Sequence, residues 1–216
     1  MRNRFDEQLY ELNKKIIEMG AMCEDAISKA ATSLSQGDVE LAQNVIHDGG
    51  MVDQMEREIE SRCMKLLLHQ QPVARDLRLI SAALKIITDM ERIGDQAEDI
   101  AEIVVCLQGQ TMDCMQLVDE MAYETTKMVQ KSVDAYVKKD VKLAEEVVVQ
   151  DDIVDDYFSR VKYDIITLIA ENSANGEFAL DLLMISKYFE RIGDHATNIA
   201  EWVIYSVTGT HKEVEI

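Results

Sequence analysis

The sequence predicts an all-α protein, built as two tandem antiparallel three-helix bundles that are related by internal duplication. The first observation is composition: one proline and nine glycines in 216 residues leave few positions that would interrupt a helix, and strong helix formers dominate. The second is a repeat, since Glu-Arg-Ile-Gly-Asp occurs at Glu91–Asp95 and again, 99 residues later, at Glu190–Asp194. The third is the regular spacing of polar turns, which divide the chain into six long segments.

The six segments are each about 25–35 residues long, which at 1.5 Å per residue gives helices of about 40–50 Å and an elongated molecule. The third turn lies at the midpoint of the chain, so we expect one repeat over residues 1–108 and a second over residues 111–208. In chain order the segments end at Gln36–Asp38, Gln70–Pro72, Gln108–Thr111, Lys138–Asp140, Asn172–Gly176 and Thr208–Thr210.

The first and fourth segments are predicted as helices by their length between turns, and the second and fifth also by an alignment of the two halves. Asp38–Ala42 reads Asp-Val-Glu-Leu-Ala, and Asp140–Ala144, 102 residues later, reads Asp-Val-Lys-Leu-Ala. The third and sixth segments align at an offset of 99 instead. The hairpin between second and third helices should therefore be three residues shorter in the second half, a change that loops tolerate.

The third and sixth segments each carry an apolar stripe with alternating spacings of four and three residues, which is typical of a helix in a bundle. The stripes are Ile86, Met90, Ile93, Ala97, Ile100, Val104 and Ile185, Phe189, Ile192, Ala196, Ile199, Val203. Gly94 and Gly193 interrupt both helices at equivalent positions, where glycine costs about 1 kcal/mol relative to alanine. We therefore expect a close helix approach or a crowded site there.

The chain is strongly acidic, with 22 basic and 41 acidic side chains and a net charge of −19. Such a charge disfavours nucleic acid and anionic membranes as partners and favours cations or a protein with a basic face. No segment reaches the ~18 apolar residues that span a bilayer, and no secretory signal is recognisable, so we expect a cytoplasmic protein. The four cysteines are scattered and are expected to be small buried hydrophobes.

Acidic side chains line one face of the third and sixth segments, opposite the apolar stripe at 100° per residue. The first set is Glu91, Asp95, Asp99 and Glu102, and the second is Glu190, Asp194, Asn198 and Glu201. Like charges one turn apart each destabilise a helix by about 0.2–0.5 kcal/mol. A bound cation would reverse this cost, because carboxylates one turn apart can share a hard metal ion.

The second and fifth segments could supply further ligands from across the helix pair. Asp151 and Asp155 form an acidic pair in the second half, whereas the equivalent positions in the first half are Gly49 and Asp53. Gly50 likewise replaces an acid of the second half. The second half is therefore expected to hold the fuller set. Oxygen ligands alone favour manganese, magnesium or ferric iron, although zinc could occupy the same place; no organic cofactor is predicted.

An alternative interpretation is that these acids form an ordinary solvated face with Arg92 and Arg191 as local counter-ions. His195 follows one of the acids, and as a single histidine it is expected at the surface rather than as a ligand. The Glu-x-x-His spacing of di-iron bundles, Gly-rich phosphate loops and nucleophile motifs are all missing from the sequence. No catalytic residue is predicted.

The doubled Glu-Arg-Ile-Gly-Asp, the segment Asn198–Glu201 and the segment Gln71–Arg78 together resemble the PhoU family of bacterial regulators of phosphate uptake. The resemblance covers almost the whole chain. It implies two tandem three-helix bundles, a homodimer and a cytoplasmic regulator without catalytic activity. Such regulators act between the ATPase of the phosphate ABC transporter and the sensor histidine kinase of the phosphate regulon, and restrain both when phosphate is plentiful.

The resemblance also implies iron or zinc clusters, which some members hold on repeated acidic pairs. Carried over, these pairs are Glu91 with Asp95, Asp95 with Asp99, Glu190 with Asp194, and Asp151 with Asp155. This chain departs from the pattern at Gly49 and Gly50, and it has asparagine at position 198.

The sequence leaves three possible functions. The first is a regulatory adaptor for phosphate uptake, and the second is an acidic metal-binding scaffold unrelated to phosphate. The third is a carboxylate-bridged metalloenzyme, which the lack of Glu-x-x-His disfavours. At −19 the chain is a poor direct receptor for phosphate, so sensing would pass through a partner or a bound metal.

Overall fold

The computed structural model describes residues 2–70, 73–111 and 116–210, and in these ranges it contains six α-helices, one short 3-10 turn and no strand. The predicted all-α class is confirmed. The helices are α1 (Arg2–Gln36), α2 (Val39–Gln70), α3 (Ala74–Cys106), α4 (Gln116–Lys138), α5 (Val141–Glu171) and α6 (Gly176–Thr208), with η2 (Ser173–Asn175) before the last. At 23 residues α4 is slightly shorter than expected. Of the predicted turn at Gln70–Pro72, the last two residues lie outside the described part.

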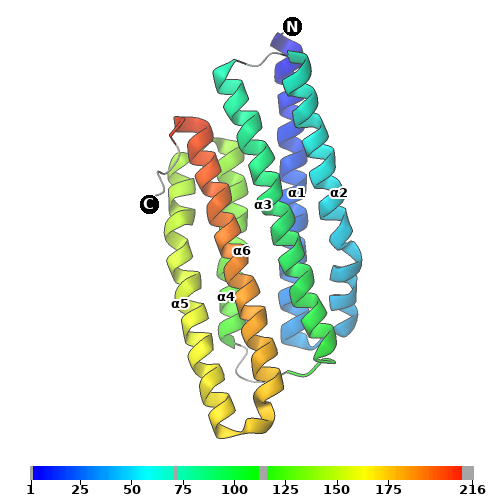
Figure 1. The fold of residues 1–216 in the computed structure, drawn as a ribbon, viewed down its shortest axis with the longest axis vertical. Coiled ribbons are helices and arrows are strands. Elements are labelled where there is room, and N and C mark those ends of the chain that lie inside the picture. The colour runs from blue at the N-terminus through cyan, green and yellow to red at the C-terminus, as the bar shows by residue number, and fades with distance from the viewer. Residues whose placement is uncertain (1, 71–72, 112–115, 211–216) are drawn as a thin grey trace.

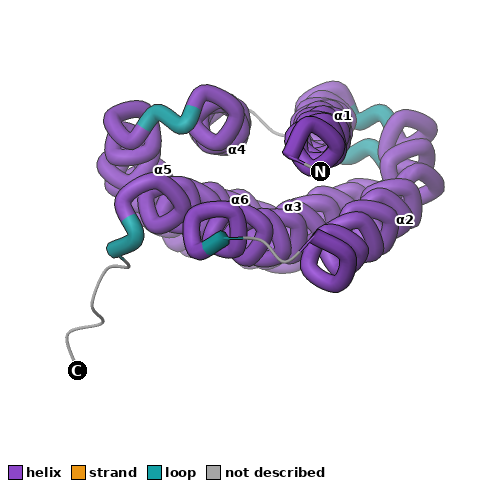
Figure 2. Tube along the Cα trace, turned by 90° about the horizontal axis from the view of Figure 1, so that it is seen from above, coloured by secondary structure: helices purple, strands orange, loops and turns teal. Residues whose placement is uncertain are grey.

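Helices α1–α3 form one bundle and α4–α6 a second, and the two lie side by side along the long axis (Figure 1). Viewed end-on, α3 and α6 lie together on one side, α1 and α4 on the other, and α2 and α5 at the outer ends (Figure 2). Direct packing of α3 on α6 and of α1 on α4 joins the bundles. Both apolar stripes are buried within one continuous hydrophobic core.

The second helix of each half begins at an equivalent aspartate, which supports the duplication in local structure. The Asp38 carboxylate accepts a hydrogen bond from the backbone N–H of Leu41 at 2.9 Å. The Asp140 carboxylate accepts from Lys142 and Leu143 at 3.1 and 3.2 Å. A side-chain acceptor at this position satisfies N–H groups that the first helical turn leaves unpaired, so both α2 and α5 have a fixed start.

Gly94 and Gly193 lie where α3 meets α2 and where α6 meets α5, beside the acidic side chains. A Cβ added at Gly94 would lie 3.1 Å from Cγ1 of Val52 on α2. At Gly193 it would lie 3.5 Å from Cγ1 of Val154 and 3.4 Å from Oδ1 of Asp151. The close approach is therefore found at Gly94, whereas Gly193 makes ordinary van der Waals contacts and has a carboxylate beside it.

Two further expectations concern the surface. No helix in the described ranges is long and apolar enough to cross a membrane. Cys23 and Cys63 are buried as predicted, but Cys106, near the C-terminal end of α3, is exposed, so the prediction was wrong there. Cys114 lies outside the described residues.

Candidate metal centre

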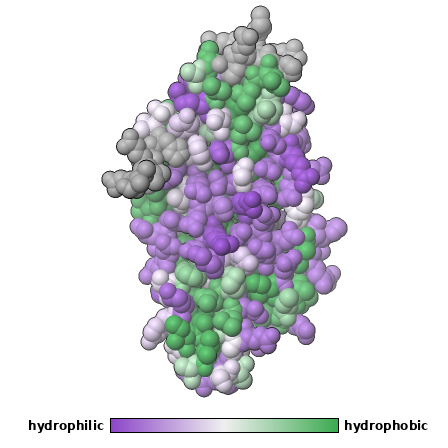
Figure 3. All heavy atoms as spheres, viewed as in Figure 1, coloured by the Kyte–Doolittle hydropathy of each residue, from purple (hydrophilic) through white to green (hydrophobic). Residues whose placement is uncertain are grey.

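The acidic residues of α3 and α6 gather in the middle of the face that these two helices form. Figure 3 shows a hydrophilic band across this region, with hydrophobic surface toward both ends. Packing of α2 on α3 and of α5 on α6 covers several of these acids in part. The Glu91 side chain keeps only 22% of its exposure and Glu190 only 15%.

Asp53 of α2 and Glu91 and Asp95 of α3 form the tightest acidic group in the first half. One carboxylate oxygen from each lies within 4.8 Å of the others, and among the described residues this is the one group with such convergence. An oxygen-ligated cation holds its ligands about 2.0–2.6 Å away, so oxygens at this spacing can share one ion. The donor set contains only carboxylates, which fits a hard cation such as Mn²⁺, Mg²⁺ or ferric iron.

The electrostatics of this group favour a cation. Burial raises the pKa of Glu91, and the neighbouring Asp95 raises it further. Burial and Asp53 likewise raise the pKa of Asp95. Repulsion among carboxylates therefore opposes their common ionisation, and a positive charge between them would relieve it.

Two arginines act as counter-ions at the rim of the group: Arg92, which the alternative interpretation named, and Arg57, which it did not. Arg92 lies 3.4 Å from Glu91 and 3.5 Å from Asp95, and Arg57 lies 3.5 Å from Asp53. Their side chains are 57% and 74% exposed, so water screens both charges. Arg92 lowers the pKa values of Glu91 and Asp95, but burial and the neighbouring acids outweigh it, so both pKa values are raised.

A fourth carboxylate of the first half was not predicted from the sequence. A Cβ at Gly49 would lie 2.2 Å from Oε2 of Glu98, which means that the Glu98 side chain of α3 covers this glycine. At the equivalent positions of the second half stand Asp151 and Thr197. In the first half the acid of this pair, Glu98, is on α3 and faces a glycine on α2. In the second half the acid, Asp151, is on α5 and the uncharged Thr197 is on α6. The acid expected to be lost at Gly49 is supplied from α3, whereas Gly50 faces open space.

In the second half Asp155, Glu190 and Asp194 occupy the positions equivalent to Asp53, Glu91 and Asp95. Asp151 lies with them, and burial raises its pKa to about 6, with Asp194 and Asp155 adding to the effect. Lys187, one turn before Glu190, pairs with the Glu190 carboxylate. It also lowers the pKa of Asp194, against the larger effects of burial and Glu190, which raise it.

The second half has the fuller set of acids on its fifth helix, as expected, but it also holds its own cation. Within the described residues, the convergence of three carboxylates within 4.8 Å is found in the first half, at Asp53, Glu91 and Asp95.

His195 and Asn198 contact the other half of the molecule. Nδ1 of His195 lies 2.9 Å from Oδ1 of Asp89 on α3, and the Asn198 amide donates to the same oxygen at 3.2 Å. His195 is half-buried rather than at the surface. Asp99 of α3 also interacts with α6. Burial raises the pKa of Asp99. The charges of Glu102 and Asp95 raise it further, and Arg191 of α6 lowers it. Asn198 and Asp99 thus lie at the α3–α6 contact rather than in the three-carboxylate group.

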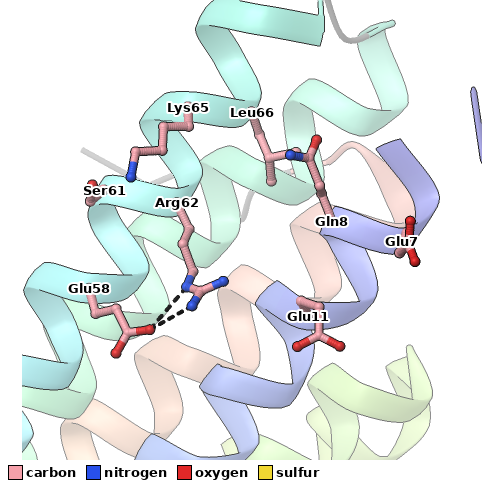
Figure 4. Close-up of a pocket in the computed structure, with 8 residues that line it drawn as sticks. All are labelled: Glu7, Gln8, Glu11, Glu58, Ser61, Arg62, Lys65 and Leu66. Carbon is pink, nitrogen blue, oxygen red and sulfur yellow. Dashed lines mark hydrogen bonds and ion pairs between the residues drawn. The ribbon is translucent and has the colours of Figure 1, made fainter. Parts of the chain in front are cut away.

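Two surface grooves lie away from the carboxylates. One, of about 510 Å³, runs between α1 and α2 (Figure 4). Its Arg62 guanidinium is bound to Glu58 at 2.7 and 3.1 Å, and Glu7 and Glu11 line the opposite wall. A second, of about 640 Å³ between α4 and α5, has three lysines and three glutamates in its lining. Neither is the basic pocket that a phosphate ion requires.

The chain matches the family model described as PhoU domain twice, over residues 16–104 and 118–203. It is 36% identical, over 100% of its length and 98% of the relative's, to a protein of Clostridium acetobutylicum named phosphate-specific transport system accessory protein PhoU homolog. It is 35% identical to the Pseudomonas aeruginosa protein of the same name, over 96% of this chain and 86% of that protein.

Two solved structures share the fold. A crystal structure of PhoU from Pseudomonas aeruginosa superimposes with a TM-score of 0.91 at 35% identity, and covers 95% of this chain and 100% of that one. The phosphate transport system regulatory protein PhoU from Streptococcus pneumoniae superimposes with a TM-score of 0.89 at 26% identity, over 97% and 100% of the two chains.

Proposed function

The chain belongs to the PhoU family, and from this membership we propose that it is a cytoplasmic regulatory adaptor that restrains phosphate uptake and phosphate-regulon signalling. The observation that carries the proposal is the match of both repeats, over nearly the full length, to proteins named as accessory to phosphate-specific transport. The chain itself catalyses no reaction in this account; it acts by binding.

Its partners are the ATPase subunit of the phosphate transporter and the cytoplasmic part of the sensor histidine kinase. A net charge of −19 suits a partner with a basic face and gives association that is faster at low salt. The active form is a homodimer. These contacts and the dimer are part of the proposal, and sedimentation together with pull-down by each partner tests them.

The metal centre of the adaptor is the group Asp53, Glu91 and Asp95, with Glu98 beside it. Bound there, a hard cation would supply positive charge that offsets carboxylate repulsion and ties α2 to α3. The carboxylates act as ligands when ionised, and the raised pKa values of Glu91 and Asp95 mean that cation binding weakens as pH falls.

Deletion of the gene tests the regulatory role. In phosphate-rich medium the deletion strain should take up phosphate faster and express a phosphate-starvation reporter, because the restraint is lost. Supplying the gene in trans should restore both to the parental level. Unchanged uptake and unchanged reporter output after deletion would contradict the proposal and favour a cation-binding scaffold unrelated to phosphate.

A further inference from the structure

The two halves place the same three acids on the same helices but arrange them differently. Asp53, Glu91 and Asp95 have carboxylate oxygens within 4.8 Å of one another. Within the described part of the chain, their equivalents Asp155, Glu190 and Asp194 form no such group. Because the three acids are identical, the difference lies in their surroundings.

One difference beside the acids is a pair of residues, one on each of the two paired helices. On α3 of the first half, Thr88 donates a hydrogen bond to Glu56 of α2 at 3.3 Å. The equivalent pair in the second half is Lys187 with Phe158, whose ring lies 5.4 Å from the Lys187 ammonium. Thr88 and Glu56 together carry one negative charge, whereas Lys187 and Phe158 together carry one positive charge. The local charge beside the three acids therefore differs by two units between the halves.

The Lys187 ammonium is held in place by several contacts. It pairs with Glu190, whose side chain is only 15% exposed, and its own side chain is 39% exposed. The Phe158 ring attracts it further, because the face of an aromatic ring is negative. Lys187 therefore lies next to the carboxylates that a metal ion would need.

We propose that Lys187 is the resident cation of the second half, neutralising Glu190 in the place of a metal ion, so that this chain binds metal in its first half alone. The proposal rests on the metal centre proposed above for the first half. An ammonium and a divalent cation repel each other at this range and compete for the Glu190 carboxylate. The residue at position 187 thus determines whether the second half can bind an ion. At the equivalent position of the first half, the uncharged Thr88 leaves the three carboxylates free to bind one.

Reciprocal exchange of these two residues provides the test. Binding of Mn²⁺ alone to the full-length chain is measured by calorimetry for wild type, Lys187→Thr and Thr88→Lys. We expect one Mn²⁺ per chain for wild type, two for Lys187→Thr and none for Thr88→Lys. Lys162→Thr, at an exposed lysine of α5, changes the net charge equally and should bind as wild type does.

A second variant guards against a folding defect. Lys187→Met keeps an unbranched side chain beside Phe158 and removes the charge, so it should also gain a Mn²⁺ site. In EDTA both Lys187 variants should melt at lower temperature than wild type, since Glu190 loses its counter-ion, and Mn²⁺ should restore the loss. The folded state of each variant is checked by circular dichroism.

The first-half site and the role of Lys187 are separated by repeating the titration in the background Asp53→Asn/Glu91→Gln/Asp95→Asn. If this triple substitution leaves wild-type binding unchanged, the first-half site is wrong. If Lys187→Thr and Lys187→Met both fold and neither gains an ion in either background, the role of Lys187 is overturned. Two ions on wild type would overturn it as well.

Discussion

Replacing Asp151 by asparagine should stabilise the metal-free protein at neutral pH. Asp151 lies on α5 against Gly193 and beside Asp194 and Asp155, and its pKa rises from 3.8 to about 6 through burial and these two charges. A folded-state pKa above the unfolded value means that the ionised group opposes folding at pH 7. The opposition weakens as pH falls through about 6 and vanishes below the unfolded value of about 3.8.

The size of the effect follows from the shift. About two pKa units at 1.36 kcal/mol each give about 3 kcal/mol as an upper value, which solvent screening of a partly exposed group reduces to about 1–2 kcal/mol. For a chain of this length that raises the melting temperature by about 3–6 °C. The neutral amide avoids this cost, so the advantage of Asp151→Asn should be largest at pH 7 and should shrink steadily toward pH 4.

Thermal unfolding in EDTA between pH 4 and 7.5, followed by circular dichroism, measures this effect. Asp152→Asn is the matched control, because Asp152 is the next residue of α5 and is exposed; it should move the melting temperature by less than about 1 °C, as is usual for surface substitutions. An Asp151→Asn variant that is less stable than wild type at pH 7, or whose advantage does not change with pH, would refute the electrostatic account of the second-half acids.

Three further predictions concern contacts of α2, α3 and α6. Gly49→Ala places a Cβ 2.2 Å from Oε2 of Glu98 and so moves that carboxylate away; calorimetry should show weaker Mn²⁺ binding, while helix propensity favours the apo protein by about 1 kcal/mol. Gly94→Ala, at 3.1 Å from Val52, should lower stability in urea by about 1 kcal/mol, whereas Gly193→Ala should be neutral or stabilising; equal effects would contradict the packing difference. His195→Ala removes the 2.9 Å contact with Asp89 and should destabilise the chain by about 1 kcal/mol, and a double-mutant cycle with Asp89→Asn that shows no coupling would argue against this contact.

The fold could be predicted from the sequence because its signals are local or repeated. Polar turns separate the helices, equivalent aspartates start α2 and α5, and the apolar stripe of α3 recurs in α6. Duplication then fixes which helices correspond. The side-by-side packing of α3 on α6 could not be predicted in this way, because it depends on how two helices distant in sequence fit together.

Only the parts of the site that follow from the geometry of one helix or from the repeat could be predicted from the sequence. Spacing of four residues on one helix places Glu91 beside Asp95, and the repeat alignment adds Asp53. The side chain of α3 that lies over Gly49 depends on how far apart α2 and α3 are. Residue spacing in the sequence does not specify that separation. One signal was present in the sequence. The pair of Gly49 and Glu98 has its acid on the third helix, whereas the equivalent pair of Asp151 and Thr197 has its acid on the fifth. The pair of His195 with Asp89 has no comparable signal.

The most direct test joins the acidic group to regulation. A strain that lacks the gene is complemented with wild type, with Asp53→Asn/Glu91→Gln/Asp95→Asn, or with a control that removes three acids exposed elsewhere, Glu60→Gln/Glu145→Gln/Asp164→Asn. Phosphate uptake is then measured in phosphate-rich medium. Wild type and control should restore restraint of uptake, and the first triple variant, folded and present at the same level, should not. Full restraint by that variant would contradict a functional role for the carboxylate group.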